Sequence, residues 1–518
     1  MVFVLATTVL LQTYSGHIFL IGTGGVAFAY LLGAALCIVL GATWQQGRPG
    51  QPLTVLFTAV LIAGFLTIGL MLSQWVGVDD LLDIWSMGSG SGRPFGNFGQ
   101  PNQTATFLLW TLIAVGWLYA QAHVRTGVAI TAALFVLWGI ALTHSRTAWV
   151  GLGLLLVASW VWRKHWRSTK LPAATSVLML CFAGMVILIS WLNSLFALNS
   201  SLNVSDIGRM NAEIRPQAWH MFLDAVSKSP WTGYGINQVV WAQMSVAHDH
   251  PALLLTFSHG HNLFLDLVLW FGLPIGGLAS VWLVAWFWQR LRRVRRADQT
   301  WPLLLILVMA NHAMLELPLH YAYFLLPTCL LMGVASVDAF NAPWSPTHSA
   351  LQKLVSTTIA ICFLAAAALW TLIARDYLRV EESYTDLRFE LARIQYKVRG
   401  TPPDVLLLNQ WHDFIELART EPEQLTSPDQ LAKTRATVAT LPSPGGFYKL
   451  ARALTLAGQP QEATQWLVRL CRIEAEDQCQ AVRTIWERDA ATEPMLKTVR
   501  WQDIEPRPNP ATTSSPSQ

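Results

Sequence analysis

Apolar segments of about twenty residues recur along this sequence, and no other feature constrains its fold as strongly. Residues 17–42, 53–75 and 172–193 are three clear examples. About 20 apolar residues in an α-helix span the hydrocarbon core of a bilayer, because each residue adds about 1.5 Å. A helix also satisfies its own backbone hydrogen bonds, which lipid cannot do. The segments therefore predict an all-α polytopic membrane protein.

Composition supports this prediction. Of the 518 residues, 53% are hydrophobic and 13% are charged, whereas soluble proteins carry about 25% charged residues. We expect about eleven transmembrane helices, within a range of 10–12, the first of them short. The predicted ranges are 2–14, 17–42, 53–75, 103–121, 127–143, 147–162, 172–193, 261–288, 302–317, 321–338 and 354–374. The net charge of +4 is small and does not predict nucleic acid as a partner.

The basic residues predict the orientation of these helices. Lys and Arg accumulate on the cytoplasmic side of membrane helices. Three basic loops, around Arg125, at 163–170 and at 290–296, fall on one side if the helices alternate in direction. The stretch 258–262, with its two histidines, then faces outward. In a Gram-negative bacterium the protein lies in the inner membrane with this stretch toward the periplasm.

The predicted helix 261–288 connects this histidine stretch to the basic loop. Its length of roughly 40 Å exceeds what a bilayer needs, so His261 is expected at or just above the outer boundary. Gly272 and Pro274 lie inside the helix. Pro removes a backbone donor, and we therefore expect a kink there.

Most ionisable residues outside the basic loops converge on the outer side. The segments concerned are 93–103, 144–147, 208–219, 258–262 and 316–321. A long loop at 193–260 contains 208–219 and ends in 258–262. Each segment alone could be a helix-capping turn with an arginine reaching the interface. Together they are harder to explain in that way, because ionisable groups at membrane depth are costly and usually mark a functional site.

The composition changes after Arg375, and the chain divides into four parts. We predict N-terminal helices and an outer loop at 1–92, a membrane core at 93–374, a periplasmic α-helical domain at 375–505 and a disordered tail at 506–518. Residues 447–456 and 461–470 read as one helical hairpin of the tetratricopeptide (TPR) type, so the domain is described as TPR-like. Cys471 and Cys479 lie in this domain, where an oxidising compartment favours a disulfide between them.

Several of these segments also resemble a known enzyme family. Residues 92–103 and 316–324 closely resemble motifs of the PglL-type bacterial protein O-oligosaccharyltransferases. Four further elements resemble motifs of the wider O-antigen ligase/polymerase superfamily. They are 145–149, Arg215 with Trp219, 230–235, and His261-Asn262 followed by Phe271-Gly272. The likeness covers nearly the whole chain.

The resemblance implies a glycosyltransferase of the inner membrane whose active site faces the periplasm. Such an enzyme takes a glycan from undecaprenyl diphosphate and transfers it en bloc to a Ser or Thr hydroxyl of a periplasmic protein, often a type IV pilin. The family resemblance further implies inversion at the anomeric carbon, no metal and no cofactor. The expected partners are the lipid-linked glycan, a pilin-like acceptor protein and membrane lipid.

Chemistry of this kind needs cations for the diphosphate and a group that orients or deprotonates the hydroxyl. Arg146 and Arg215 suit the first task, because guanidinium binds phosphate oxygens in a bidentate way. Arg93 and Arg209 are further candidates. His261 suits the second, since neutral imidazole accepts a proton near pH 7. His261 could equally donate a hydrogen bond to the diphosphate, and the sequence does not separate these roles.

The remaining candidates are substrate-binding residues. Asn102 belongs to a Gly- and Pro-rich loop expected to close over the donor, and Asn262 follows His261. His259 and His320 are additional outer histidines, with Glu316 close to His320; the alternative for His320 is a cap bonded to that carboxylate. Asp266 is expected to be a poor direct partner of His261, because the two lie roughly 140° apart around a helix.

The triplet 248–250, His-Asp-His, lies in a loop without the ligand spacing of a helix or strand. We interpret it as a solvated loop and expect no metal there. Three alternative functions remain open: an O-antigen ligase acting on lipid A-core, a repeat-unit polymerase, and a transporter of lipid-linked glycans. Transporters place ionisable residues near the bilayer midplane, which the outer clustering argues against. The domain after residue 376 could also dock the acceptor protein.

Overall fold

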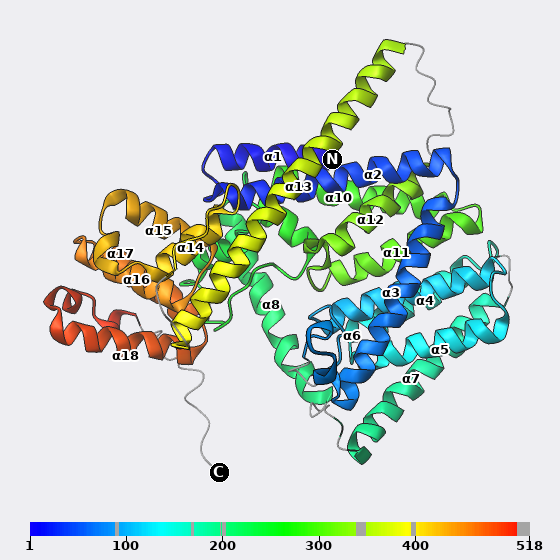
Figure 1. The fold of residues 1–518 in the computed structure, drawn as a ribbon, viewed down its shortest axis with the longest axis horizontal. Helices are drawn as coiled ribbons and strands as arrows, with labels where there is room; N and C mark the ends of the chain where they lie inside the picture. Colours follow the sequence, from blue (N-terminus) through cyan, green and yellow to red (C-terminus); the bar gives the residue numbers. More distant parts are fainter. Residues whose placement is uncertain are drawn as a thin grey trace.

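The computed structural model describes residues 1–88, 93–166, 170–196, 198, 204–337, 349–394 and 400–504, without the side chains of residues 83, 204–213 and 349–356. Its regular elements are all helices in these ranges (Figure 1). They are α1 (Val2–Tyr14), α2 (Ile21–Gly47), α3 (Gln51–Val76), η1 (Asp79–Trp85), α4 (Pro101–Ala120), α5 (Thr126–Leu142), α6 (Arg146–Val161), α7 (Leu171–Phe196), α8 (Val204–Lys228), α9 (Val239–Val246), α10 (Leu263–Arg292), α11 (Ala297–Ala313), η2 (Pro318–His320), α12 (Ala322–Ser336), α13 (Ser349–Ala392), α14 (Asn409–Arg419), α15 (Pro428–Thr440), α16 (Pro444–Leu456), α17 (Pro460–Ile473) and α18 (Glu476–Thr492).

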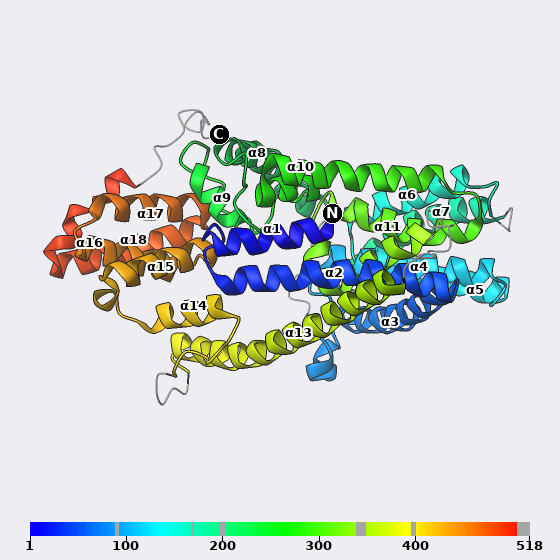
Figure 2. The same cartoon turned by 90° about the horizontal axis from the view of Figure 1, so that it is seen from above.

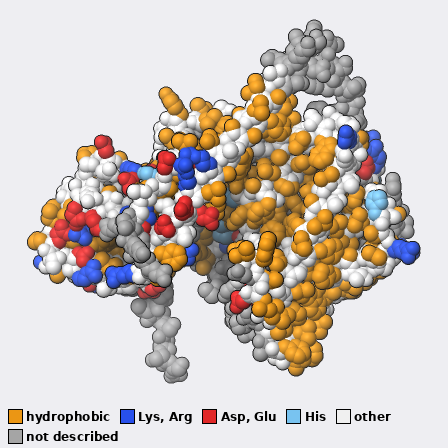
Figure 3. All heavy atoms as spheres, in the orientation of Figure 1, with side chains coloured by type: hydrophobic (Ala, Val, Ile, Leu, Met, Phe, Trp, Pro, Cys, Tyr) orange, Lys and Arg blue, Asp and Glu red, His pale blue; other side chains and the backbone are white. Residues whose placement is uncertain are grey.

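The predicted apolar segments are all helical. Among the described residues, 6 helices are long and apolar enough to cross a membrane: α2, α3, α4, α7, α10 and the part of α13 from Thr357 to Ala392. Four shorter apolar helices, α1, α5, α6 and α12, accompany them. Hydrophobic side chains cover much of the visible bundle surface, and charged ones gather over the C-terminal helices (Figure 3). The fold is thus an all-helical multi-pass membrane protein, and the number of spans stays a prediction.

The helices of the bundle pack around one large apolar core. Phe57 of α3, Trp110 of α4 and Phe324 of α12 are almost completely buried in it. The indole N–H of Trp110 donates to the carbonyl oxygen of Leu305 on α11 at 3.0 Å, so this polar atom is satisfied inside the core. This packing fixes the helix ends that carry the functional residues.

Two helices, α8 and α9, were missed in the sequence analysis. The stretch 193–260 was expected to be a long loop, but it contains the 25-residue helix α8 and the 8-residue helix α9. α8 was not predicted because it is polar and contains Pro216, so it lacks the apolar run of a membrane helix. The predicted domain boundary at 374/375 falls inside α13 and stays a prediction. Figure 2 shows α13 passing along the bundle toward the C-terminal helices.

The kink expected in α10 is present, and a second segment fills the break. Gly272 has φ 74°, a left-handed conformation inside the helix. Leu273 N–H donates to the Pro230 carbonyl at 2.7 Å, and Tyr234 and Gly235 N–H donate to the carbonyls of Leu269 and Trp270 at 2.6 and 3.0 Å. A Cβ on Gly272 would lie 2.4 Å from the Trp231 carbonyl oxygen. Glycine is therefore required at position 272, because another backbone segment approaches it closely. That segment, residues 230–235, provides hydrogen-bond partners for backbone N–H and C=O groups that the kink leaves without helical partners.

The C-terminal helices lie at one end of the bundle, beyond α1 and α2 (Figure 2). α16 and α17 form the predicted helical hairpin, while its assignment to the tetratricopeptide type stays a prediction. These helices share one apolar core with α9, which contributes Val240 and Met244. The rings of Trp241 and Trp466 stack at 6.1 Å. The domain is therefore joined to the membrane core by packing as well as by the chain.

Cys471 and Cys479 form a disulfide in this domain, with their Cα atoms 5.0 Å apart. It connects the end of α17 to the start of α18 and closes a short loop. The other described cysteines, Cys37, Cys181, Cys329 and Cys362, are not paired with one another.

Deleting all residues after 376 is expected to destabilise the whole protein. The deletion uncovers Val240 and Met244 of α9, and full burial of such a side chain is worth about 1.5–3 kcal/mol. It also removes hydrogen-bond donors of the fully buried Asp376 carboxylate, which accepts the N–H groups of Leu406, Leu407 and Leu408 at 2.9, 2.6 and 3.2 Å. Size-exclusion chromatography and thermal unfolding in detergent would measure the effect. A chain ending at residue 504 is the control, and an unchanged Tm for the 1–376 chain would contradict the shared core.

Candidate functional site

Four segments that are far apart in the sequence meet at one end of the bundle, around the carboxylate of Glu316. Glu316 follows α11 and its side chain is 7% exposed. Its Oε1 accepts a hydrogen bond from Arg215 Nη2 of α8 at 2.6 Å and one from Asn102 Nδ2 of α4 at 3.4 Å. Its Oε2 lies 3.4 Å from Nδ1 of His261, just before α10. The predicted outer cluster therefore has a carboxylate at its centre.

The surroundings keep this carboxylate charged. Burial alone would raise the pKa of Glu316, but the hydrogen bond from His261 and the charges of His261 and Arg215 outweigh it and hold that pKa at about 2. A charged Glu316 accepts a short, strong hydrogen bond from Arg215 and attracts Nδ1 of His261 at 3.4 Å. It therefore holds the guanidinium of Arg215 and the imidazole of His261 in fixed positions.

The two histidines of the 258–262 stretch differ in environment. His259 is 7% exposed, and burial followed by the nearby His261 lowers its pKa to about 3. It is therefore neutral near pH 7. Its Nε2 lies 3.2 Å from Nδ1 of His261, and its Nδ1 lies 3.0 Å from the Ser258 hydroxyl. His261, with a side chain 20% exposed, is the more accessible of the pair.

These contacts favour one tautomer of His261. Its Nδ1 faces the carboxylate of Glu316, which only accepts hydrogen bonds, so the proton of a neutral ring is best placed on Nδ1. Nε2 then carries a lone pair and makes no hydrogen bond within the described part of the chain. A carboxylate bonded to Nδ1 orients the ring and makes Nε2 a better proton acceptor.

Four hydrogen bonds hold the backbone around His261. The N–H of Gly260 donates to Asp266 Oδ1 at 2.6 Å, and its carbonyl accepts from Trp219 Nε1 at 2.9 Å. Asn262 caps α10 by accepting the N–H of Leu265 at 3.3 Å, as well as that of Phe264. His261 itself has φ 53°, an uncommon conformation for a residue other than glycine. Surrounding contacts thus hold a strained residue, as is common at functional sites.

A second cationic group lies near the start of α6. Arg93 donates two hydrogen bonds to the Thr143 carbonyl, at 3.0 and 2.7 Å. Burial and then the neighbouring charge of Arg146 lower the pKa of Arg93. Arg146 is the first residue of α6 and is exposed. Two guanidinium groups close enough to repel each other, beside a helix N-terminus, form a favourable place for an anion.

Asn102 connects this cationic group to the carboxylate. Its Oδ1 accepts a hydrogen bond from the Ser145 hydroxyl at 2.7 Å, and the same hydroxyl accepts from Ala148 N–H at 3.4 Å as the cap of α6. Asn102 therefore places the start of α4 between Glu316 and Arg146. Ser145 was predicted only as part of the motif 145–149, without a role of its own, although serine before a helix is a capping signal.

His320 and Arg209 complete the set of predicted residues. The structure gives His320 no bond to the Glu316 carboxylate, which rules out the alternative that it caps that group. Its ring packs on Trp270 with centroids 5.3 Å apart and on His259 at 6.2 Å. Burial lowers its pKa to about 4, and its Nε2 has no hydrogen-bond partner among the residues that the structure describes. The side chain of Arg209 lies outside the described residues.

A cavity of about 590 Å³ begins at this site and runs into the bundle. Its polar end is lined by Glu316, His320 and Asp266. The rest is apolar and is lined by residues of α1, α2, α10, α11 and α12, including Leu267, Trp282, Phe287 and Met332. The lining residues follow most of the length of α10. Arg215 does not line the cavity but contacts Glu316 at its polar end. A long apolar cavity with such an end suits a ligand with a lipid tail and a polar head.

The site residues also contain a possible metal-ligand set. Donor atoms of His259, His261 and Glu316 lie within 4.8 Å of one another. The Arg215 guanidinium already lies 2.6 Å from that carboxylate. A divalent cation would have to share the carboxylate with it, so this donor set suits a hydrogen-bonded charge network better than a metal centre.

Sequence reasoning missed the two residues that position the histidine turn. Trp219 was noted only beside Arg215 in a motif, and Asp266 was judged a poor partner of His261. Asp266 indeed does not bond to His261, but it accepts the N–H of Gly260 six residues earlier. A buried aspartate one turn into an apolar helix was the signal for this role, since buried carboxylates require donors.

Comparisons with known proteins cover the same segments. Three family models match: "Protein glycosylation ligase" at residues 94–119, "O-Antigen ligase" at 130–280 and "Virulence factor membrane-bound polymerase, C-terminal" at 300–485. A general O-oligosaccharyltransferase of Acinetobacter baylyi is 29% identical over 462 residues, 87% of this chain and 78% of that protein. A ComP-specific O-oligosaccharyltransferase of the same organism is 26% identical over 282 residues, 54% of this chain and 51% of that protein.

Proposed function

This chain belongs to the O-antigen ligase superfamily, in its branch of PglL-type bacterial protein O-oligosaccharyltransferases, and from this membership we propose its reaction. It transfers an oligosaccharide en bloc from undecaprenyl diphosphate to Ser or Thr hydroxyls of periplasmic proteins such as type IV pilin. The observation that carries the proposal is the network of Arg215, Glu316 and His261, in which the Glu316 carboxylate also lines the polar end of the apolar cavity.

Arginines bind the leaving group in this proposal. The donor carries a diphosphate whose negative charge grows as the bond from its oxygen to the anomeric carbon breaks. Arg215 lies at the network, and Arg146 lies at the exposed start of α6. Guanidinium groups aimed at developing charge stabilise the transition state without reorganisation. Arg93, whose hydrogen bonds go to the Thr143 carbonyl, supports the position of this loop.

His261 acts as the proton acceptor. The acceptor hydroxyl attacks the anomeric carbon from the side opposite the diphosphate, and its proton passes to Nε2 of His261. Glu316, bonded to Nδ1, stabilises the imidazolium that results. The new bond joins the anomeric carbon to the Ser or Thr oxygen with inversion, and undecaprenyl diphosphate leaves. These residues supply every group that this step uses, so the proposal involves neither a metal nor a cofactor.

The cavity accommodates the lipid part of the donor. Its apolar walls follow α10, and its polar end carries Glu316 and His320. A polyprenyl tail in the cavity places the diphosphate at that end, next to Arg215. The basic residues 290–296 follow the opposite end of α10, where a cytoplasmic location is expected. This supports the proposal that the reaction takes place at the periplasmic face of the inner membrane.

An O-antigen ligase that uses lipid A-core, or a repeat-unit polymerase, is the second candidate. The family descriptions at 130–280 and 300–485 favour it. The donor chemistry is the same in these enzymes, and only the acceptor differs. A transporter of lipid-linked glycans fits less well, because the ionisable residues gather at helix ends such as those of α4, α6, α10 and α11 rather than at mid-helix breaks.

The acceptor decides between these functions. The chain would be expressed in cells that lack their own protein transferase and O-antigen ligase but make a lipid-linked glycan, together with a pilin acceptor. We expect glycan on the pilin, seen as a gel shift and an intact-mass increase, and none on lipopolysaccharide. Arg215→Ala, expressed at the same membrane level, is the inactive control.

Each other outcome reassigns the protein. Glycan on lipid A-core alone would make it a ligase, and longer glycan chains on the lipid carrier would make it a polymerase. Modification of none of these by the wild-type protein would contradict the proposal and favour transport.

A further inference from the structure

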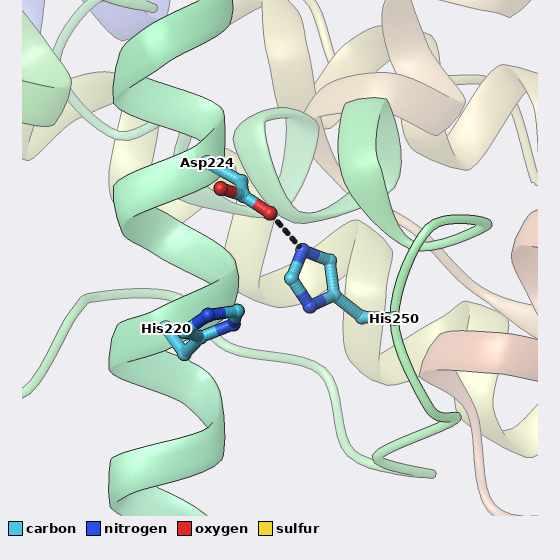
Figure 4. Close-up of side chains that lie close together, drawn as sticks. All are labelled: His220, Asp224 and His250. Atoms are coloured by element: carbon cyan, nitrogen blue, oxygen red, sulfur yellow. Dashed lines mark ion pairs between the residues drawn. The ribbon is translucent and has the colours of Figure 1, made fainter.

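We propose that His220, Asp224 and His250 form a binding site for a divalent transition metal such as Zn²⁺. The three side chains lie outside the network around Glu316, and Figure 4 shows them facing one another. His220 and Asp224 come from α8, and His250 comes from the loop that follows α9. The proposal rests on geometry and ligand chemistry and is independent of the proposed function.

The helix supplies two of the three ligands. His220 and Asp224 are four residues apart, so they lie on the same face of α8, one turn from each other. Both are exposed and can adjust their rotamers, while His250 is buried. One donor atom from each residue lies within 4.8 Å of the others, and the His220 and His250 rings are 5.4 Å apart. Zinc–ligand distances of about 2.0–2.2 Å then require only small side-chain rotations.

The buried histidine lacks a hydrogen-bonding partner for one ring nitrogen. Nε2 of His250 lies 2.7 Å from Asp224 Oδ2, but this contact misses hydrogen-bond geometry, and the nitrogen has no hydrogen-bond partner among the described residues. Buried polar atoms are nearly always satisfied, so such a nitrogen requires an explanation. A metal ion shared with Asp224 and His220 would provide its partner.

The local charges distinguish this cluster from two others of similar composition. In the Glu316 cluster Arg215 lies 2.6 Å from the carboxylate, and in the cluster of His412, Asp413 and Glu416 the amine of Lys433 lies 3.0 and 2.5 Å from the two carboxylates. There a side-chain cation already neutralises the acidic groups. Within the described chain, Asp224 has no Lys or Arg partner; the nearby Lys228 pairs with Asp249 at 2.7 Å.

The ligand set selects the class of metal. Two imidazoles with one carboxylate favour Zn²⁺ and its neighbours in the first transition row over Mg²⁺ or Ca²⁺, which prefer oxygen ligands. The fourth position of a tetrahedral site would face solvent, because Asp224 is 52% exposed. The triplet 248–250 was interpreted from the sequence as a solvated loop, and no metal was expected there. Of this triplet only His250 belongs to the proposed site, because Asp249 contacts Lys228 and His248 instead.

A metal here would join three parts of the molecule. α8 carries Arg215 about one and a half turns before His220. His250 begins the loop that leads to His259 and His261, and its carbonyl oxygen accepts from Arg472 Nη1 of the C-terminal domain at 2.7 Å. The ion would therefore link α8 to the loop that runs from His250 to His261. It would restrict the motion of the two segments that carry Arg215 and His261.

Zinc binding to the purified full-length protein tests the inference. The protein in detergent is stripped with a chelator and titrated with Zn²⁺ by calorimetry, and Tm is measured with and without Zn²⁺. We expect one strong site per chain and a higher Tm. His220→Ala and Asp224→Asn, both at exposed positions, should each weaken binding by at least the roughly tenfold loss that even outer-shell changes cause. Co²⁺ in place of Zn²⁺ should show the visible absorption of a tetrahedral site, and lose it in both variants.

His248→Ala and His412→Ala are the matched controls, since each removes a histidine near an acidic side chain outside the proposed ligand set. Both should keep the zinc affinity of the wild type. The inference is overturned if the wild type binds no zinc, if His220→Ala binds it equally well, or if His412→Ala abolishes binding.

Discussion

Replacing Glu316 by glutamine is expected to lower glycan transfer by roughly 10²- to 10⁴-fold, the range typical of a disturbed general base. The side chain keeps its size, but the charge that binds Arg215 at 2.6 Å and faces His261 at 3.4 Å is lost. The new amide could donate to Nδ1 of His261, which would move the ring proton to Nε2. A ring protonated at Nε2 has no lone pair for the acceptor hydroxyl.

The measurement is initial-rate transfer to a purified pilin from a lipid-linked glycan, in detergent. Because Glu316 is a positioning residue, the loss should lie mainly in kcat, with a smaller change in KM for the donor. Glu423→Gln, which removes an exposed ion pair with Arg452 in the C-terminal domain, is the matched control and should keep full activity. If Glu316→Gln retains more than about a tenth of the wild-type rate, the network does not orient the base.

Replacing His261 is expected to cause the other large loss, again about 10²- to 10⁴-fold in kcat. The substitution should be His261→Asn as well as His261→Ala. Residue 261 has φ 53°, and asparagine tolerates this left-handed conformation better than alanine does. Equal losses in both variants would therefore assign the effect to the missing imidazole rather than to a disturbed turn.

The kinetic constants separate the two roles left open for His261. Loss of a base should lower kcat, whereas loss of a donor to the diphosphate should raise KM for the lipid-linked glycan. His259→Ala is the comparison, because His259 is buried and its pKa of about 3 keeps it neutral near pH 7. Full activity of His261→Asn would move the chemistry away from this residue.

The membrane bundle could be predicted from sequence because its signals are local. Apolar runs identify helices such as α3 and α7, and Gly272 with Pro274 predicts the break in α10. α8 was missed because its pattern is polar and contains Pro216. The site was predicted as a set of neighbouring segments, since their outer location follows from alternating helices.

The pairings inside the site could not be predicted in this way. Glu316 was grouped with His320 because the two are four residues apart, yet its contacts are with Arg215, 101 residues away, and with Asn102, 214 residues away. Asn262 was expected to bind substrate, and the structure shows its side chain capping α10. Such pairings depend on how helix ends meet in space, which a single sequence does not encode locally.

The core shared by α9 and the C-terminal helices has a consequence for exchanging parts between related enzymes. Val240 and Met244 are surrounded by side chains of α15 to α17, and Thr256 donates to the Ile473 carbonyl at 3.1 Å. The unit that can be transplanted is therefore discontinuous in sequence: residues 239–257 must travel with 409–504. A chimera with a single junction after α13 would pair α9 of one enzyme with the C-terminal helices of the other, and their side chains would not fit. A graft of both segments would keep the native packing between α9 and these helices.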